Sequence, residues 1–227
     1  MKAALILLFL AFPAEAQTIV RARLIEPTTR YGHHPMGPTV ADHGALDLVL
    51  SDGSRRTIRL PESRVFEDNA ARLADLTGDD APEVVLVESD LERGARLSVY
   101  GPAGLVAAGP FIGQRNRWMA VAGIADLDGD GTPEIAVVDR PHLRRTLVIW
   151  QQRGSELVPV AELAGVTNHR FGEATIGGGI RTCADGSEVI VASPDLSQTL
   201  AVTFDGVALR ARPVAGTMAT AMGCRQP

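Results

Sequence analysis

Lysine is almost absent from this sequence of 227 residues. Lys2 is the only lysine, so every basic side chain after it belongs to an arginine or a histidine. This excludes Schiff-base chemistry, a phosphate-binding P-loop lysine and Ser-Lys catalysis from the chain beyond Lys2. Two explanations of the arginine bias remain open: codon usage, and selection of arginine for planar recognition of carboxylate, phosphate or sulfate groups.

Familiar catalytic motifs are missing as well. The sequence has neither a G-x-S-x-G nucleophile elbow nor an H-E-x-x-H zinc motif. Residues 177–179 are three glycines, but they lack the spaced third glycine and the following helix of a dinucleotide-binding fingerprint. The formal net charge of −5 gives no reason to expect nucleic acid or an anionic membrane surface as a partner.

Long apolar runs are confined to the N-terminus. Residues 3–12 are apolar, Lys2 precedes them, and Ala14-Glu15-Ala16 forms a small-x-small cleavage site. This pattern predicts a secretory signal peptide over residues 1–16, which is too short to span a membrane stably. We therefore expect residues 17–227 to form one soluble domain without a membrane span, in the periplasm or outside the cell.

Helical periodicity is absent after residue 16, which predicts an all-β fold. Short runs rich in β-branched residues are separated by turn residues, and Asp52-Gly53 marks a tight hairpin. The expected strands near the N-terminus are 19–25, 46–51 and 56–60. In the middle of the chain they are 119–125, 135–138, 145–151 and 158–163, with a turn at residues 153–155.

One stretch, A-D-L-D-G-D-G-T-P-E over residues 125–134, is dense in carboxylates. Like charges this close are costly to hold together unless a cation lies among them. Alternate positions supply oxygens, and Gly129 and Gly131 allow a tight turn. An EF-hand starts similarly, but its twelfth position needs a glutamate and here is Val137. The predicted calcium ligands are Asp126, Asp128, Asp130, the carbonyl of Thr132, and Glu134.

A similar phrase occurs earlier in the chain. Asp126 follows Asp75 by 51 residues, and Glu134 follows Glu83 by the same interval, which indicates a repeat architecture. A third copy near Glu188 has lost its aspartates and is expected to bind nothing. In the earlier loop, an ordinary turn with solvated acids is the alternative to a metal site. Its predicted ligands are Asp75, Thr77, Asp79, Ala81 and Glu83.

These loops resemble those of the FG-GAP or VCBS repeat proteins, the integrin alpha N-terminal-like repeats whose hallmark is D-x-D-G-D-G-x-x-D/E. The resemblance implies a β-propeller with calcium in the loops, and implies little about activity. The match is close at residues 126–134 and looser at 75–83, where Thr77 replaces an aspartate and Asp80 a glycine. The repeats fall at about 64–113, 114–166 and 167–215.

The length of the chain leaves room for about four four-stranded blades in a small β-propeller. Five blades are the alternative, and an open stack of sheets is a third option. We expect the N- and C-terminal segments to complete a further blade, with residues 217–223 as its inner strand. Cys183 and Cys224 are expected to form a disulfide that ties the C-terminus to the neighbouring blade, with two free thiols as the alternative.

The repeat alignment places several cationic and aromatic side chains on the face opposite the acidic loops. Arginine pairs with acidic groups and tryptophan stacks on sugar rings, so this face is a candidate site for a uronate or a sulfated glycan. The alternatives are solvated loop residues paired with acids and, for Trp118, packing inside the strand layer. The candidate residues are Arg115, Arg117, Trp118, Arg140, His142, His169 and Arg170.

The five histidines of the sequence allow two interpretations. In one interpretation the histidines meet in space as a transition-metal site, and in the other they are isolated imidazoles. They are His33, His34, His43, His142 and His169. The predicted function is an exported, calcium-stabilised β-propeller that binds an acidic glycan or an exported protein without catalysis. The alternatives are a lyase or hydrolase acting on an acidic polysaccharide, and an accessory subunit of a periplasmic assembly.

Overall fold

The computed structural model describes residues 17–224, and the predicted signal peptide lies outside this range. The fold is all-β, as the sequence predicts. Its strands are β1 (Ile19–Thr28), β2 (Asp42–Leu50), β3 (Arg55–Arg59), β4 (Arg64–Phe66), β5 (Arg72–Ala74), β6 (Glu83–Asp90), β7 (Gly94–Gly101), β8 (Gly104–Ala108), β9 (Met119–Ala125), β10 (Glu134–Asp139), β11 (Thr146–Arg153), β12 (Glu156–Ala164), β13 (Gly179–Cys183), β14 (Gly186–Ala192), β15 (Thr199–Phe204) and β16 (Leu209–Val214). Among the described residues, the one helical element is a 3-10 helix, η1 (Thr220–Met222), and no helix is long and apolar enough to cross a membrane.

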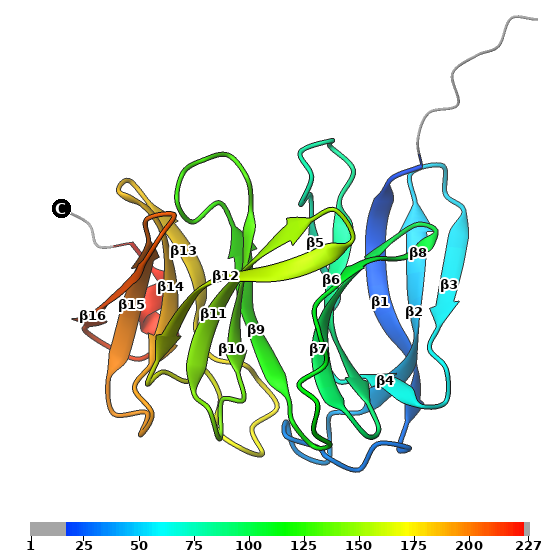
Figure 1. Ribbon diagram of the computed structural model, residues 1–227, viewed down its shortest axis with the longest axis horizontal. Helices are drawn as coiled ribbons and strands as arrows, with labels where there is room; N and C mark the ends of the chain where they lie inside the picture. The colour runs from blue at the N-terminus through cyan, green and yellow to red at the C-terminus, as the bar shows by residue number, and fades with distance from the viewer. Residues whose placement is uncertain (1–16, 225–227) are drawn as a thin grey trace, which may run out of the picture.

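The strands form four antiparallel units in chain order. The first unit is β1 to β3, the second β4 to β8, the third β9 to β12 and the fourth β13 to β16. The first three units are joined into one curled twelve-stranded sheet through short contacts, β2 with β4 and, in parallel, β8 with β12. Figure 1 shows the units following one another along the long axis of the molecule, from the first unit at one end to the fourth at the other.

Hydrophobic side chains of the central strands fill the space between successive units. Every residue of β10 is buried, and its side chains alternate between two cores. Ile135 and Val137 pack towards the second unit, whereas Ala136 and Val138 pack towards the fourth. A strand covered on both faces needs apolar residues at successive positions, which explains the unbroken run of residues 135–138.

The expected local elements are confirmed. The four strands of the third unit fall where the sequence predicts them, with ends that differ by no more than two residues. The Asp52-Gly53 hairpin joins β2 to β3, and Gly53 takes the positive φ of 83° that a tight turn requires. Antiparallel neighbours and turn residues are local signals, so they are readable without the tertiary structure.

Two expectations about the chain ends differ from the structure. Within residues 17–224 no strand of the first unit pairs with one of the fourth, so circular closure is not seen. Residues 217–223 contain η1 and a turn in place of an inner strand. Met218 and Met222 pack with Ala221 against Ile190 and Ala201, so this segment covers an apolar face of the fourth unit and does not extend the sheet at an edge.

The loops divide between the two ends of the strands. The acidic loops, between β5 and β6 and between β9 and β10, lie at the upper end in Figure 1. Loops 29–41, 140–145, 165–178 and 193–198 lie at the lower end. Loop 29–41 reaches across the later units, because the Gly172 amide donates to the Pro35 carbonyl at 2.8 Å and the Asn116 amide to the Tyr31 hydroxyl at 2.8 Å.

Candidate metal loop and the cleft at the opposite end

Three carboxylates converge in the loop between β9 and β10. Oxygen atoms of Asp126, Asp128 and Asp130 all lie within 4.8 Å of one another. Gly129 and Gly131 adopt φ of 83° and 91°, the left-handed region that lets the chain turn tightly here. The donor set consists of hard oxygens, which fits Ca²⁺ better than a transition ion.

Backbone amides hold this loop in shape. The Asp126 carboxylate accepts hydrogen bonds from the Gly129 amide at 2.7 Å and from the Gly131 amide at 3.0 Å. The Thr132 amide donates to Asp130 at 2.7 Å. Glu134 is buried and accepts from the Leu127 amide at 2.9 Å and the Gln151 side chain at 3.0 Å, and burial raises the pKa of its carboxyl group. The loop is therefore preorganised, and Glu134 braces it from inside.

The earlier loop repeats this hydrogen-bond pattern with its carboxylates at other positions. Asp75 accepts from the Gly78 amide at 2.7 Å and the Asp80 amide at 2.9 Å, and the Ala81 amide donates to Asp79 at 3.0 Å. Glu83 accepts from the Leu76 amide at 3.1 Å. Thr77 stands where the later loop has Asp128, and within residues 17–224 no cluster of three carboxylates forms at this loop.

The acidic loop also borders the fourth unit. A cleft of about 560 Å³ runs between them, and its lining includes Asp126, Asp128, Asp185 and Asp205. The third copy of the repeat has become a tight hairpin, in which Cys183 pairs with Gly186 across the turn. Its one aspartate in the turn, Asp185, lines the cleft.

Trp118 does not serve as a sugar-stacking platform. Its side chain is 2% exposed, and its indole N–H donates to the Glu67 carbonyl at 2.8 Å. The alternative interpretation, packing inside the strand layer, is correct for this residue. An indole buried with its one donor satisfied is a structural anchor.

Most of the predicted arginines have acidic or backbone partners. Arg140 pairs with Asp139 at 2.8 Å, and Arg170 with Glu173 at 3.1 Å. Arg117 donates to the Asn116 carbonyl at 2.9 Å. Arg115 lies near Tyr31, away from the cleft described next. For Arg140 and Arg170 these partners favour the alternative of loop residues paired with acids.

A cleft at this end does gather part of the predicted set. It has a volume of about 370 Å³ and lies between loops 140–145, 165–178 and 193–198. Phe171, which is 63% exposed, lies edge-on to the His142 ring, 5.3 Å between centroids. The exposed phenylalanine ring and the side chains of Arg145 and Arg170 therefore line one cleft. The lining residues are Pro141, His142, Arg145, Thr167, His169, Arg170, Phe171, Pro194, Asp195 and Leu196.

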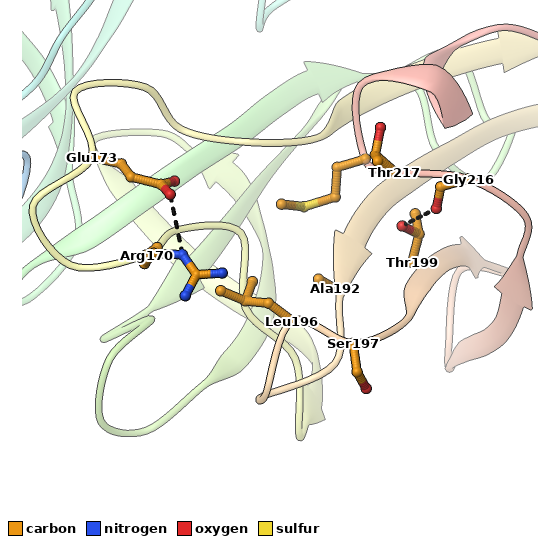
Figure 2. Close-up of a pocket in the computed structure, with 9 residues that line it drawn as sticks. Arg170, Glu173, Ala192, Leu196, Ser197, Thr199, Gly216 and Thr217 are labelled. Carbon is orange, nitrogen blue, oxygen red and sulfur yellow. Dashed lines mark hydrogen bonds and ion pairs between the residues drawn. The ribbon is translucent and has the colours of Figure 1, made fainter.

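A second pocket of about 440 Å³ adjoins this cleft, because Arg170 and Leu196 line both. Figure 2 shows the Arg170 guanidinium between Glu173 and Leu196, with Thr199 turned towards the Gly216 carbonyl, to which it donates at 2.8 Å. The two pockets form one groove along the lower end of the third and fourth units. The groove is polar at Arg170 and apolar towards Ala192.

The two histidines of the cleft are in direct contact. His142 Nε2 lies 2.8 Å from His169 Nδ1. Burial, with smaller effects of His169, His33 and Arg145, lowers the pKa of His142 to about 4, and burial also lowers the pKa of His169. Both imidazoles are therefore neutral at neutral pH.

Sequence reasoning missed a group of buried polar residues under loop 29–41. Glu67 is fully buried, lies 2.7 Å from His33 Nδ1 and accepts from the Ser89 hydroxyl at 2.5 Å. Burial raises the pKa of Glu67. Asp42 is 3% exposed, and burial and the charge of Glu67 raise its pKa to about 7. The only signal in the sequence was a pair of acids, Glu67-Asp68, directly after the apolar β4.

The raised pKa of the Asp42 carboxyl group predicts that the free energy of unfolding falls as the pH rises. Its pKa is raised from 3.8 to about 7, so its contribution is fully present below pH 4 and is lost through pH 7. Three pKa units correspond to about 4 kcal/mol as an upper limit. Urea unfolding between pH 4 and 8 should show this loss, and Asp42→Asn should reduce it.

Asp47→Asn is the matched control for that measurement. Asp47 is also buried in β2 but is paired with Arg23 at 3.0 Å, so Asp47→Asn removes a carboxylate of the same strand that has a cationic partner. An unchanged slope in Asp42→Asn would contradict the assignment.

Cys183 and Cys224 form a disulfide, as expected. The bond closes a segment with a sequence separation of 41 and fixes the chain beyond η1 to the end of β13. Arg181 supports the same attachment, because its guanidinium donates to the Ala221 carbonyl at 2.7 Å and pairs with Glu188 at 2.6 Å.

No model of a known protein family matches this sequence, and a search of curated proteins finds no similar sequence. The chain is thus defined by its own features: an all-β array of four antiparallel units, a three-carboxylate loop at one end and a groove containing two histidines at the other.

Proposed function

We propose that this chain is an exported, calcium-stabilised binding module made of four blades of the FG-GAP or VCBS type, without catalysis of its own. The shared hydrogen-bond pattern of the two acidic loops supports the repeat assignment. The four antiparallel units favour four blades over five. Because the first and fourth units lie at opposite ends, the proposed propeller is an open array.

Calcium in this proposal is held by residues 126–134. The converging carboxylates of Asp126, Asp128 and Asp130 support this assignment, and the Thr132 carbonyl and Glu134 complete the proposed ligand set. At residues 75–83 the proposed affinity is lower, since Thr77 removes one carboxylate. Affinity in such loops follows the number of charged ligands.

Export is supported by the signal-peptide pattern of residues 1–16 and by the disulfide. Disulfides persist in oxidising compartments such as the periplasm and the extracellular space. The proposed location is therefore the periplasm or the outside of the cell.

The observation that carries the binding function is the exposed ring of Phe171 over a cleft that Arg145 and Arg170 also line. Guanidinium groups bind carboxylates through paired hydrogen bonds, and an exposed aromatic ring packs against the apolar face of a sugar. The proposed ligand is an acidic glycan, and a uronate polymer is the simplest probe. An exported protein with an acidic loop is the other partner this cleft accommodates.

The test is calorimetric titration of residues 17–227 with a polyuronate and with its methyl ester, which has the same backbone and no charge. The protein should bind the acid form only. Arg145→Gln and Arg170→Gln should each weaken binding by about 10- to 100-fold, the effect of a lost charge-assisted hydrogen bond. Phe171→Ala should weaken it without changing its dependence on salt.

Arg210→Gln is the matched control, because Arg210 is an exposed arginine paired with Asp205 and outside the cleft. Equal binding of the ester, or full binding by the Arg145 and Arg170 variants, overturns the assignment. Shortening of the polymer during the titration favours a lyase or hydrolase, a function that the His142–His169 pair in the cleft makes worth measuring.

A further inference from the structure

Three of the five histidines gather at one place although they lie far apart in the sequence. His33 comes from loop 29–41, His142 from loop 140–145 and His169 from loop 165–178. His142 Nε2 lies 2.8 Å from His169 Nδ1. His33 and His142 line a common void of about 20 Å³, which is room for one water molecule or one ion.

Hydrogen-bond partners on one ring nitrogen fix the orientation of two of these imidazoles. His33 Nδ1 lies 2.7 Å from the buried carboxylate of Glu67, which also accepts from Ser89. His169 Nε2 lies 2.7 Å from the Glu173 carbonyl. A carbonyl only accepts, so His169 Nε2 carries the proton and Nδ1 keeps a lone pair. In the same way, the Glu67 carboxylate accepts from His33 Nδ1, so the Nε2 atom of His33 keeps its lone pair.

Metal-binding histidines in proteins have hydrogen bonds of this kind on the ring nitrogen that does not bind the metal. Their second ring nitrogen almost always donates to a carboxylate or a backbone carbonyl, which fixes the tautomer and the direction of the ring. Burying a carboxylate such as Glu67 costs free energy, and an isolated surface histidine does not require such a partner.

We propose that His33, His142 and His169 bind one divalent first-row transition ion, with Zn²⁺ as the probe. Imidazole nitrogen is a preferred ligand of Zn²⁺, and three protein ligands leave a fourth position open. The open position faces the cleft of about 370 Å³ that His142 and His169 line. An anionic group held there by Arg145 would complete the coordination.

Binding requires one side chain to turn. Within residues 17–224 only the acidic loop holds three ligand atoms within 4.8 Å of one another, so His33 or His142 rotates into the void to meet the ion. Trp118 limits this movement to one side, because its ring is stacked on His142 at 6.1 Å and meets His169 edge-on at 5.0 Å.

The test uses untagged residues 17–227 in excess Ca²⁺, titrated with Zn²⁺ by calorimetry. One Zn²⁺ should bind per chain. His142→Ala and His169→Ala should each weaken binding by more than about 100-fold, and Glu67→Gln by about 10- to 100-fold. Co²⁺ bound at the same site should show the visible absorption of a four-coordinate ion, which His169→Ala removes.

His43→Ala and Asp128→Asn are the controls, the first a histidine outside the cluster and the second a residue of the acidic loop. Both should bind Zn²⁺ like the wild-type chain. Absence of binding, equal binding in His169→Ala, or loss of binding in Asp128→Asn overturns the proposal. Circular dichroism of each variant distinguishes a lost site from a lost fold, and Glu67→Gln keeps the buried shape if an alanine variant unfolds.

Discussion

Excess chelator should lower the melting temperature of residues 17–227 by about 5–10 °C relative to saturating Ca²⁺. An ion that binds only the folded state at 100 times its dissociation constant adds about 2.7 kcal/mol, and a domain of this size shifts by about 2–4 °C per kcal/mol. The carboxylates of Asp126, Asp128 and Asp130 repel one another when no cation lies between them. Circular dichroism during heating measures the shift.

Asp128→Asn makes this expectation specific to one loop. Asparagine still accepts the hydrogen bond that the Asp130 amide makes to Asp128 at 3.1 Å, but it removes one charge. In Ca²⁺ the variant should melt below the wild-type chain, because it binds the ion more weakly. In chelator it should melt at or above the wild-type chain, because one repulsive charge is gone. The sign of the effect therefore reverses with calcium.

Asp79→Asn is the matched change in the loop at residues 75–83, where Asp79 accepts from the Ala81 amide at 3.0 Å. It should leave most of the calcium response intact. If the calcium-dependent shift of the melting temperature disappears in Asp79→Asn and persists in Asp128→Asn, the ion binds residues 75–83, which contradicts our proposal for residues 126–134. A wild-type melt that is the same in calcium and chelator contradicts structural calcium altogether.

Loss of the disulfide should lower the melting temperature as much as removal of calcium does, or more. Opening a cross-link with a sequence separation of 41 releases chain entropy in the unfolded state worth about 4 kcal/mol. Cys183→Ser with Cys224→Ser should therefore lower the melting temperature by roughly 8–16 °C. The amide of Ala221, which donates to the Thr217 carbonyl in η1, should exchange its hydrogen faster.

The control is the reductant itself. Dithiothreitol should shift the melt of the wild-type chain towards that of the double variant and leave the double variant unchanged. If oxidised and reduced wild-type chains melt together, Arg181 and the contacts of η1 hold the C-terminus without help from the disulfide.

Local features were readable from the sequence because their causes are local. The run of residues 135–138 is apolar at every position because both faces of β10 are covered, and the run alone located the strand. Asp52-Gly53 specified a hairpin through the positive φ of Gly53. The acidic loops were visible since their aspartates accept from amides only two to five residues away.

Expectations that depended on distance in space were less successful. Trp118 was a candidate for sugar stacking, yet its indole lies against Glu67, which is 51 residues away. For the predicted cationic face, the sequence left open whether the arginines are paired with acids, and the structure pairs Asp139 with Arg140 and also with Arg144. Closure of a ring was expected from the resemblance to propeller repeats and from the likeness of residues 217–223 to an inner strand. Length sets the number of units but not the direction in which the last one packs.

The sequence by itself determined the all-β class, the repeated units, the acidic loops and the cysteine pair, because periodicity, turn residues and spacing act over a few residues. Only the tertiary structure decided that loop 29–41 crosses to the later units and brings His33 towards His142 and His169. It also decided that Glu67 is buried behind His33. These contacts join residues between 34 and more than 100 positions apart, and packing between units, which no local pattern encodes, sets their geometry.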